Sequence, residues 1–284
     1  MQKPFFRILI WLGIVSVLSL LAMGLWLIAC GGSQTTESLK WLQLLQTLGT
    51  FLLPPVCCAW LWGEGHRPFR WLKLDKGADW RLFVLAVTLM ICAIPAINLL
   101  ADLNGRIELP ESLAFIEQKL KAYEESAAEL TKRFLQADNV WGMLANIGLM
   151  AFLPAMAEEL SFRGTMQQIL SNSQFTIHNS KVHVAIWITA IVFSAIHMQF
   201  YGFIPRMLMG AMFGYIFVWS GSLWLPIVMH FTNNGLAVFV YWLVGEENNY
   251  ADTIGAGVTW WLGVLSLLVT SLGLLIFYRR TRKQ

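Results

Sequence analysis

Charged side chains are scarce in this sequence. Asp, Glu, Lys and Arg make up 13% of its 284 residues, whereas soluble domains carry roughly 25%, so a soluble or disordered protein is not indicated. The formal net charge is +3, and the basic residues lie at the ends of apolar segments rather than along one stripe, which argues against a nucleic-acid partner. Because 57% of the residues are hydrophobic, we expect the lipid bilayer to be the main surroundings of the chain.

Cysteine motifs are missing as well. No Cys-x-x-Cys pair is present, so neither a disulfide framework nor a thiolate zinc site is indicated; the four cysteines are Cys30, Cys57, Cys58 and Cys92. The residues that end in Cys30, Leu-Ile-Ala-Cys, are similar to a bacterial lipoprotein cleavage site. The apolar run before it, 8–29, is longer than the roughly 7–15 residues of a signal peptide. We therefore expect an uncleaved first helix, with lipidation of Cys30 as the alternative.

Long apolar segments divide the chain. A membrane-spanning helix needs about 20 mostly apolar residues, and an open strand in hydrocarbon would leave backbone amides unpaired at several kcal/mol each. The predicted fold class is therefore all-α, a polytopic transmembrane helical bundle of about eight spans. These are 8–29, 41–62, 82–101, 139–160, 182–198, 204–220, 222–244 and 257–278.

Basic residues give the expected orientation. They precede the first span, lie between the second and third, and follow the last. An even number of spans places all three groups on one side of the membrane, and basic loops mark the cytoplasmic side. Both termini are therefore predicted to be cytoplasmic.

The connector 102–138 differs from the spans because it carries eight acidic and five basic residues. Its apolar residues recur at steps of three and four, which predicts one apolar stripe on a helix. We expect an amphipathic helix between spans three and four, on or near the outer face. It is read either as a solvated connector or as a substrate gate.

Ionisable residues inside apolar segments are the strongest functional signal, because each costs roughly 2.5–3.5 kcal/mol at mid-membrane. The first group, Glu158-Glu159-x-x-x-Arg163, ends the fourth segment. Glu159 and Arg163 have the spacing of an intrahelical ion pair, which leaves Glu158 without a local counter-ion and available as a general base. Pro154 predicts a local kink one turn before it. Interfacial charges at a helix end are the alternative interpretation.

Two further groups follow along the chain. Phe193-x-x-x-His197 ends the fifth segment, and His230-x-x-x-Asn234 places two polar side chains on one face of the seventh. A histidine with structural partners and a polar contact between helices are the alternative interpretations.

Taken together, these three groups in this order on consecutive apolar segments resemble the CPBP family. That family comprises the CAAX prenyl endopeptidases (CAAX proteases) and the bacteriocin-processing or self-immunity proteins, also called ABI proteins. The resemblance covers about 139–244, over a third of the chain, and the short chain indicates a prokaryotic member. It divides the chain into an N-terminal region with the connector, 1–138, a catalytic core, 139–244, and a last span with a basic tail, 245–284.

The resemblance implies an intramembrane endopeptidase, a hydrolase of the bacterial inner (cytoplasmic) membrane. Glu158 would activate water with His197 beside it, and His230 and Asn234 would stabilise the oxyanion. Glu159 would orient the site and Arg163 would hold Glu159, with Phe193 as a further supporting residue. The expected partner is a peptide or a membrane-protein substrate, with or without a lipid tail.

The need for a metal is open at this point. Two histidines and two carboxylates match the composition of a His₂Glu zinc site, and the family is often named as metalloproteases. The sequence has no His-Glu-x-x-His, and the resemblance implies a glutamate-activated water with no cofactor required. If zinc binds, its ligands are expected to be Glu158, His197 and His230.

The predicted span ends place Glu158 and His197 at different depths. With the fourth segment ending at 160, Glu158 lies near the cytoplasmic side, whereas His197 lies about 24 Å along the fifth segment from Lys181 at 1.5 Å per residue. A shared site therefore requires the fourth helix to end early, or the fifth to start deep or to tilt.

Two other functions stay open. A non-proteolytic membrane scaffold or bacteriocin self-immunity protein can use the same fold. A small ion-coupled transporter can use Glu158 and His197 as a proton relay, although the sequence has no inverted repeat of the kind that favours this class.

Overall fold

The computed structural model describes residues 4–63, 65, 67–171, 181–245 and 253–282. Within these ranges the chain forms helices and connecting turns, without a strand. The predicted all-α class is therefore confirmed. Seven helical segments of the described chain are long and apolar enough to cross a bilayer, and the protein is a multi-pass membrane protein.

Each predicted span corresponds to one helical segment. The continuous ones are α1 (Pro4–Cys30), α5 (Trp80–Gly105), α11 (Phe203–Ser220) and α12 (Trp224–Val244), and the last consists of η7 (Gly257–Thr259) and α13 (Trp260–Thr281). The second consists of α2 (Thr36–Gln46), η1 (Thr47–Leu52) and α3 (Leu53–Trp62). The fourth consists of α7 (Val140–Asn146), η4 (Ile147–Phe152), α8 (Leu153–Ser161), η5 (Phe162–Gln167) and α9 (Gln168–Ser171). The predicted fifth span, 182–198, forms α10 (Lys181–Ala195), which at 15 residues is shorter than the others.

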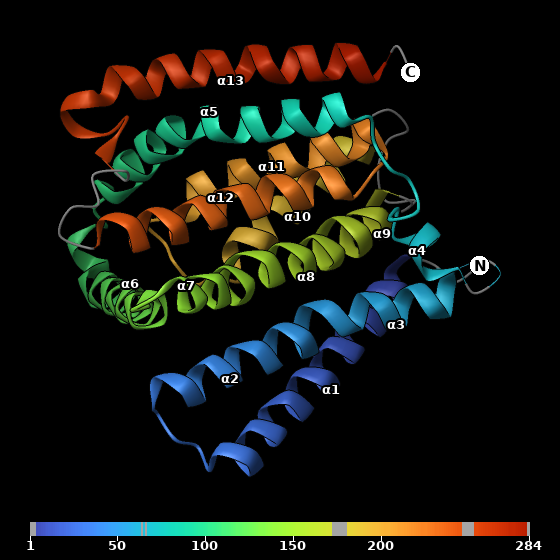
Figure 1. Cartoon of the computed structure of the whole chain (residues 1–284), viewed down its shortest axis with the longest axis horizontal. Helices are drawn as coiled ribbons and strands as arrows, with labels where there is room; N and C mark the ends of the chain where they lie inside the picture. Colours follow the sequence, from blue (N-terminus) through green and yellow to red (C-terminus); the bar gives the residue numbers. More distant parts are fainter. Residues whose placement is uncertain (1–3, 64, 66, 172–180, 246–252, 283–284) are drawn as a thin grey trace.

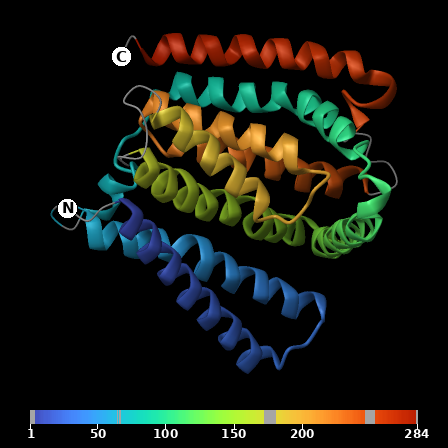
Figure 2. The same ribbon diagram turned by 180° about the vertical axis from the view of Figure 1, so that it is seen from behind.

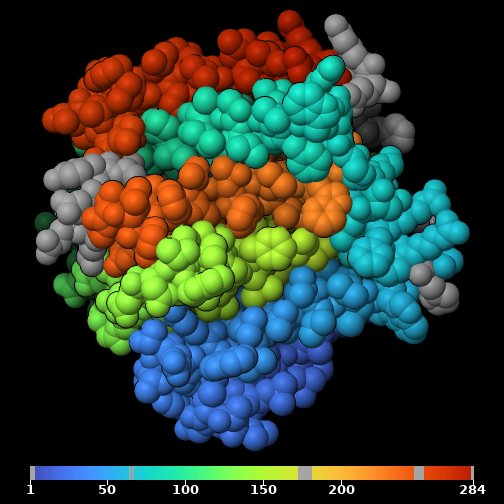
Figure 3. Space-filling model, in the orientation of Figure 1, coloured from blue at the N-terminus to red at the C-terminus, as the bar shows by residue number. Residues whose placement is uncertain are grey.

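The helices stack in layers (Figure 1). α13 forms one edge beside α5, α10 to α12 lie in the middle, α7 to α9 follow, and α1 to α3 form the opposite edge (Figures 1 and 3). Figure 2 shows the molecule from behind, and α10 and α11 lie in front in that view. The start of α1 and the end of α13 lie at the same end of the bundle, and the connector helix α6 (Ala114–Leu135) lies at the other. That the shared end is cytoplasmic stays a prediction.

The fourth membrane segment is longer than predicted. Its helical course runs over Val140–Ser171, so the predicted end at residue 160 is wrong. The polar residues that end the apolar run are buried and bonded inside the bundle. Arg163 bonds Glu159 at 2.6 Å, and the Gln167 amide donates to the carbonyl of Gly214 at 3.2 Å. A polar side chain with such partners continues a helix that hydropathy alone would end.

Prolines shape two of the membrane segments. The π-helical turn η1 precedes Pro55, and η4 precedes Pro154. Because proline has no N–H to close the ordinary helical bond, a wider turn is a common local adjustment. The Ser161 hydroxyl donates at 2.9 Å to the carbonyl of Phe51, the group that Pro55 cannot reach with an N–H. Glu158 follows Pro154 by one turn, directly after such an irregular stretch.

Gly210 lets α11 lie close to α10 and to the Arg163 side chain of η5. A Cβ atom at this position would lie 3.1 Å from the Phe193 ring and 3.2 Å from a guanidinium nitrogen of Arg163. Small residues at contacts between membrane helices allow such close backbone approach. The carbonyl of Gly210 thereby comes within hydrogen-bond reach of Arg163.

Candidate active site

The longer fourth segment removes the predicted difference in depth. Glu158 lies 13 residues before Ser171 and His197 lies 16 residues after Lys181, or about 20 Å and 24 Å at 1.5 Å per residue. α9 ends and α10 begins at the same end of the bundle (Figure 1), so both side chains lie at similar depth, well inside the layer. An early end of the fourth helix, one of the expected alternatives, is not what the structure shows, because the helix continues past Glu158 to Ser171.

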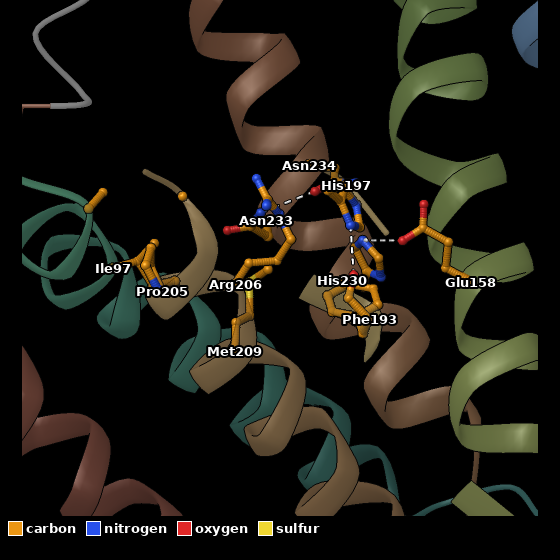
Figure 4. Close-up of a pocket in the computed structure, with 12 residues that line it drawn as sticks. Ile97, Glu158, Phe193, His197, Pro205, Arg206, Met209, His230, Asn233 and Asn234 are labelled. Atoms are coloured by element: carbon orange, nitrogen blue, oxygen red, sulfur yellow. Dashed lines mark hydrogen bonds and ion pairs between the residues drawn. The ribbon is translucent and has the colours of Figure 1, made fainter. Parts of the chain in front are cut away.

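A pocket of about 420 Å³ collects the predicted catalytic side chains. Glu158, His197, His230 and Asn234 all line it, together with Phe193 (Figure 4). Glu159 and Arg163 lie behind this surface and are fully buried. The remaining lining residues are Ile97, Ala101, Gly202, Pro205, Arg206, Met209 and Asn233.

Glu159 and Arg163 form a buried ion pair of 2.6 Å between a carboxylate oxygen and Nη1, with both side chains at 0% exposure. The second guanidinium nitrogen, Nη2, donates to the carbonyl of Gly210 at 2.8 Å. The guanidinium carbon lies 4.6 Å from the ring centre of Phe193 and 5.4 Å from that of Phe213. Aromatic faces and an opposite charge compensate the lost hydration of a buried guanidinium. The predicted pairing of these two residues is present.

His230 lies between the two glutamates. Its Nδ1 is 2.9 Å from Glu159 Oε1, and its Nε2 is 3.9 Å from Glu158 Oε2. Because an ionised Glu159 can only accept, Nδ1 carries the proton of that bond. The other nitrogen, Nε2, is therefore left for Glu158 and the pocket. Glu158 Oε2 is buried without a hydrogen-bond partner among the described residues.

His197 and the two asparagines complete the pocket wall. His197 Nδ1 lies 2.8 Å from the carbonyl of Phe193, which can only accept, so Nδ1 is the donor and Nε2 is the remaining nitrogen. The Asn233 amide donates to the Asn234 side-chain oxygen at 3.1 Å. This bond uses the oxygen of Asn234 and leaves its NH₂ group to donate elsewhere.

The loop that carries His197 is anchored by α5 and α6. Asn104 accepts from the N–H of Ile204 at 2.8 Å and donates to the carbonyl of Phe200 at 3.1 Å. Glu124 of α6 accepts from the N–H of Tyr201 at 2.9 Å. These contacts fix the end of this segment that leads into α11.

Glu117 of α6 also reaches this loop. It accepts from the Tyr201 hydroxyl at 3.3 Å and pairs with Lys121 at 2.7 Å. The hydrogen bond from Lys121 is the main cause that lowers the pKa of Glu117, and the same bond raises the pKa of Lys121. Burial, followed by the charge of Glu117, raises the pKa of Tyr201. The predicted amphipathic helix is thus present, and Glu117 and Glu124 contact the bundle, while Glu129 and apolar residues such as Phe115 and Tyr123 are exposed.

The part of the chain that carries the polar pocket residues matches a known protein family. Residues 140–236 match the family model described as type II CAAX prenyl endopeptidase Rce1-like. The predicted family resemblance is confirmed. The match includes all three polar groups, from Glu158 to Asn234, and leaves the first three membrane segments and the last outside it.

One curated protein is also similar to part of the chain. A Bacillus subtilis (strain 168) protein, described as uncharacterized protein YpbD, is 26% identical over 92 residues, which are 31% of this chain and 41% of that relative. The chain thus spans less than half the length of this curated relative. No solved structure matches the chain.

The three residues predicted to hold zinc if it binds are Glu158, His197 and His230. In the part of the chain that the structure describes, no group of three or more His, Cys, Asp or Glu side chains is arranged to hold a metal ion. Three protein ligands plus water are usual for catalytic zinc, so the arrangement does not fit that site as it stands. That no cofactor is required, with zinc as the alternative, stays a prediction.

The sequence analysis did not predict Arg206 or Asn233, which also line the pocket. Arg206 had a clear signal, because it is a cation inside the predicted span 204–220 and such residues are functional candidates by default. Asn233 also had a signal, because it follows His230 by three residues and so lies near the same helical face as Asn234. The structure shows that both adjacent amides reach the pocket.

Proposed function

We propose that this protein is an intramembrane endopeptidase in which Glu158 activates the water that attacks a peptide carbonyl. One observation carries the proposal: Glu158 Oε2 is buried, has no hydrogen-bond partner among the described residues, and faces His230 Nε2 across 3.9 Å in a polar pocket. The match of residues 140–236 to prenyl endopeptidases supports the same reaction class.

The geometry favours a water between Glu158 and His230. A separation of 3.9 Å is too long for a direct hydrogen bond and suits groups that share one water. Glu158 takes a proton from this water, and the oxygen attacks the carbonyl carbon of the substrate. The tetrahedral intermediate collapses as Glu158 returns the proton to the leaving amine, so that peptide and water yield one acid and one amine.

Asn234 is the best placed donor for the oxyanion of this intermediate, because its NH₂ group is not used in the bond with Asn233. His230 is a donor at Nε2 only when its ring carries a second proton, since Nδ1–H already faces Glu159. Glu159 and Arg163 orient the His230 ring, as carboxylates commonly orient catalytic histidines. Phe193 packs edge-to-face against both His197 and His230, with ring centres 5.2 and 6.0 Å apart.

We propose a peptide or membrane-protein substrate that enters from the bilayer, with CAAX-type lipidated peptides as the first class to test. We also propose that the protein resides in the bacterial inner membrane with both termini cytoplasmic. The basic segment ends and the family match support these two assignments.

A cleavage assay with matched variants tests this function. Purified protein is incubated with quenched-fluorescent peptide libraries, one with and one without a farnesylated cysteine. Glu158→Gln should lower kcat/KM by about 10²–10⁴-fold, and Asn234→Ala by about 10²–10³-fold. Glu129→Gln, the same change on the exposed face of α6, should have no effect.

Equal cleavage by wild type and Glu158→Gln would remove the mechanism. A chelator arm decides the metal question separately. Loss of cleavage on chelation and its return with added zinc would show that a metal is required, contrary to our expectation.

A further inference from the structure

Arg206 is a cation in the wall of the pocket that the proposed reaction does not use. It lies in the first turn of α11 and lines the pocket beside Gly202 and Pro205. Its Nη2 donates to the side-chain oxygen of Gln199. Its Nη1 is buried and has no hydrogen-bond partner among the described residues.

The charge of Arg206 lacks an adjacent anion. Within the described chain, no carboxylate lies within 4.0 Å of its guanidinium as an ion pair. Glu124, on the neighbouring helix α6, is hydrogen-bonded to the N–H of Tyr201. An unpaired guanidinium at this depth is costly unless a partner arrives.

The surroundings of Arg206 favour an anion. The side chain projects from the N-terminal turn of α11, an 18-residue helix whose partial positive charge adds to that of the guanidinium. Glu158 is the acidic residue of the pocket lining, and Figure 4 shows it on the other side of the two histidines from Arg206. The pocket thus has a hydrolytic end at Glu158 and a cationic end at Arg206.

Because Gly202 has no side chain, it leaves room for the guanidinium of Arg206. A Cβ atom at this position would lie 3.0 Å from Nη2 of Arg206 and 3.6 Å from its central carbon. A residue with a side chain there would press the guanidinium away from its present position. The close fit indicates a defined orientation rather than a loose surface cation.

We propose that Arg206 binds the free C-terminal carboxylate of the peptide whose bond is cut at Glu158. This inference rests on the proposed function and adds the group that selects the substrate. A pocket of about 420 Å³ lies at the lower end of the range for small-ligand sites and holds a few residues. A substrate that places its chain end in the pocket needs one opening, whereas a substrate that binds through an internal segment needs an opening on each side. A carboxylate is the anion that every free chain end offers, and a guanidinium binds it with two parallel hydrogen bonds.

The experiment compares two peptide libraries that differ only at their ends, one with a free carboxylate and one with a carboxamide. Wild type should cleave the acid form roughly 10–100-fold faster in kcat/KM, the range expected for a hydrogen bond between charged groups. Arg206→Gln should lower cleavage of the acid form by that factor and leave the amide form unchanged. Arg106→Gln, the same change at an exposed ion pair, should keep the wild-type preference. Arg206→Lys should retain part of it, because a lysine keeps the charge and loses the fork.

Two outcomes would overturn the inference. One is equal cleavage of both libraries by wild type. The other is an equal loss for both libraries in Arg206→Gln, which would mean that Arg206 acts on Glu158 and not on the substrate end.

A binding arm separates the inference from the proposed function. The intrinsic tryptophan fluorescence of Glu158→Gln protein is titrated with each library. Tighter binding of the acid form that disappears in the double variant Glu158→Gln/Arg206→Gln supports carboxylate recognition even where no peptide is cleaved. Absence of cleavage by wild type would reject the protease alone, and equal binding of both libraries would reject the role of Arg206.

Discussion

Two Glu–Arg pairs with the same helical spacing lie in opposite surroundings. Glu159 and Arg163 are separated by 2.6 Å with both side chains at 0% exposure. Glu129 and Arg133 of α6 are separated by 2.5 Å with exposures of 65% and 52%. Residue types, order and distance agree, and burial differs.

The difference in burial changes what each pair does. An exposed pair is screened by water and contributes little, typically 0.3–0.5 kcal/mol at this spacing. A buried pair leaves an uncompensated charge when one partner is removed, at a cost of about 3–5 kcal/mol. Glu159 also bonds His230, so the buried pair fixes the orientation of a side chain that lines the pocket. The exposed pair has no contact of that kind with the pocket.

Removing the arginine from each pair should give the largest contrast. Arg163→Leu should lower the free energy of unfolding by about 3–5 kcal/mol, because Glu159 is left buried with His230 as its remaining partner. Arg133→Leu should change it by no more than about 0.5 kcal/mol. Reversible denaturant unfolding in mixed micelles measures both. Similar losses in the two variants would show that burial does not separate the pairs.

A methyl group added beside Arg163 should lower the free energy of unfolding by less than the loss of the arginine. Gly210→Ala places a methyl group 3.2 Å from its guanidinium and 3.1 Å from Phe193, which should cost about 1–3 kcal/mol as overpacking. Gly13→Ala in α1 meets no atom within 4 Å and should be neutral or stabilising, since alanine favours a helix. The same unfolding assay measures this pair of variants. A Gly210→Ala protein as stable as Gly13→Ala would show that the contact with α11 is not tight.

A third ion pair, between Glu117 and Lys121 of α6, should make the loop before α11 respond to pH. Folded-state contacts, chiefly the bond from Lys121, lower the pKa of Glu117. The stability that this carboxylate contributes is therefore fully present above its usual pKa of about 4.3 and is lost as the pH falls through its lowered folded-state pKa. Hydrogen exchange in the loop 197–202, corrected for the intrinsic rate, should increase slightly on that descent in wild type. Glu117→Gln should abolish this increase in exchange. If the variant keeps the pH response of the wild type, another group holds the loop.

The sequence was sufficient for the helices and for the main polar groups of the pocket. Apolar length located each membrane segment, and the steps of three and four residues located α6. The spacing of Glu159 and Arg163 predicted their ion pair. These features depend on residues close together in the chain, where helical geometry alone sets the distances.

Features that depend on distant residues were not predictable. The end of the fourth segment at Ser171 rather than 160 depends on partners from other helices, such as the Gly214 carbonyl that bonds Gln167. The bond between His230 and Glu159 joins residues 71 positions apart. The role of Asn104 in holding the loop before α11 likewise appears only in three dimensions. Hydropathy assigns each of these side chains a cost and carries no information about the partner that offsets it.

The shortness of α10 has a consequence for the lipid around it. Its 15 residues extend about 22 Å at 1.5 Å per residue, against a hydrocarbon thickness of about 30 Å. Its outer side chains, including Trp187, Ile188 and Ile191, are exposed and so contact acyl chains. A helix shorter than the bilayer draws the lipid surface inward, and His197 lies just past one end of this helix. Acyl-chain length is therefore a control on how far bulk water stands from the pocket.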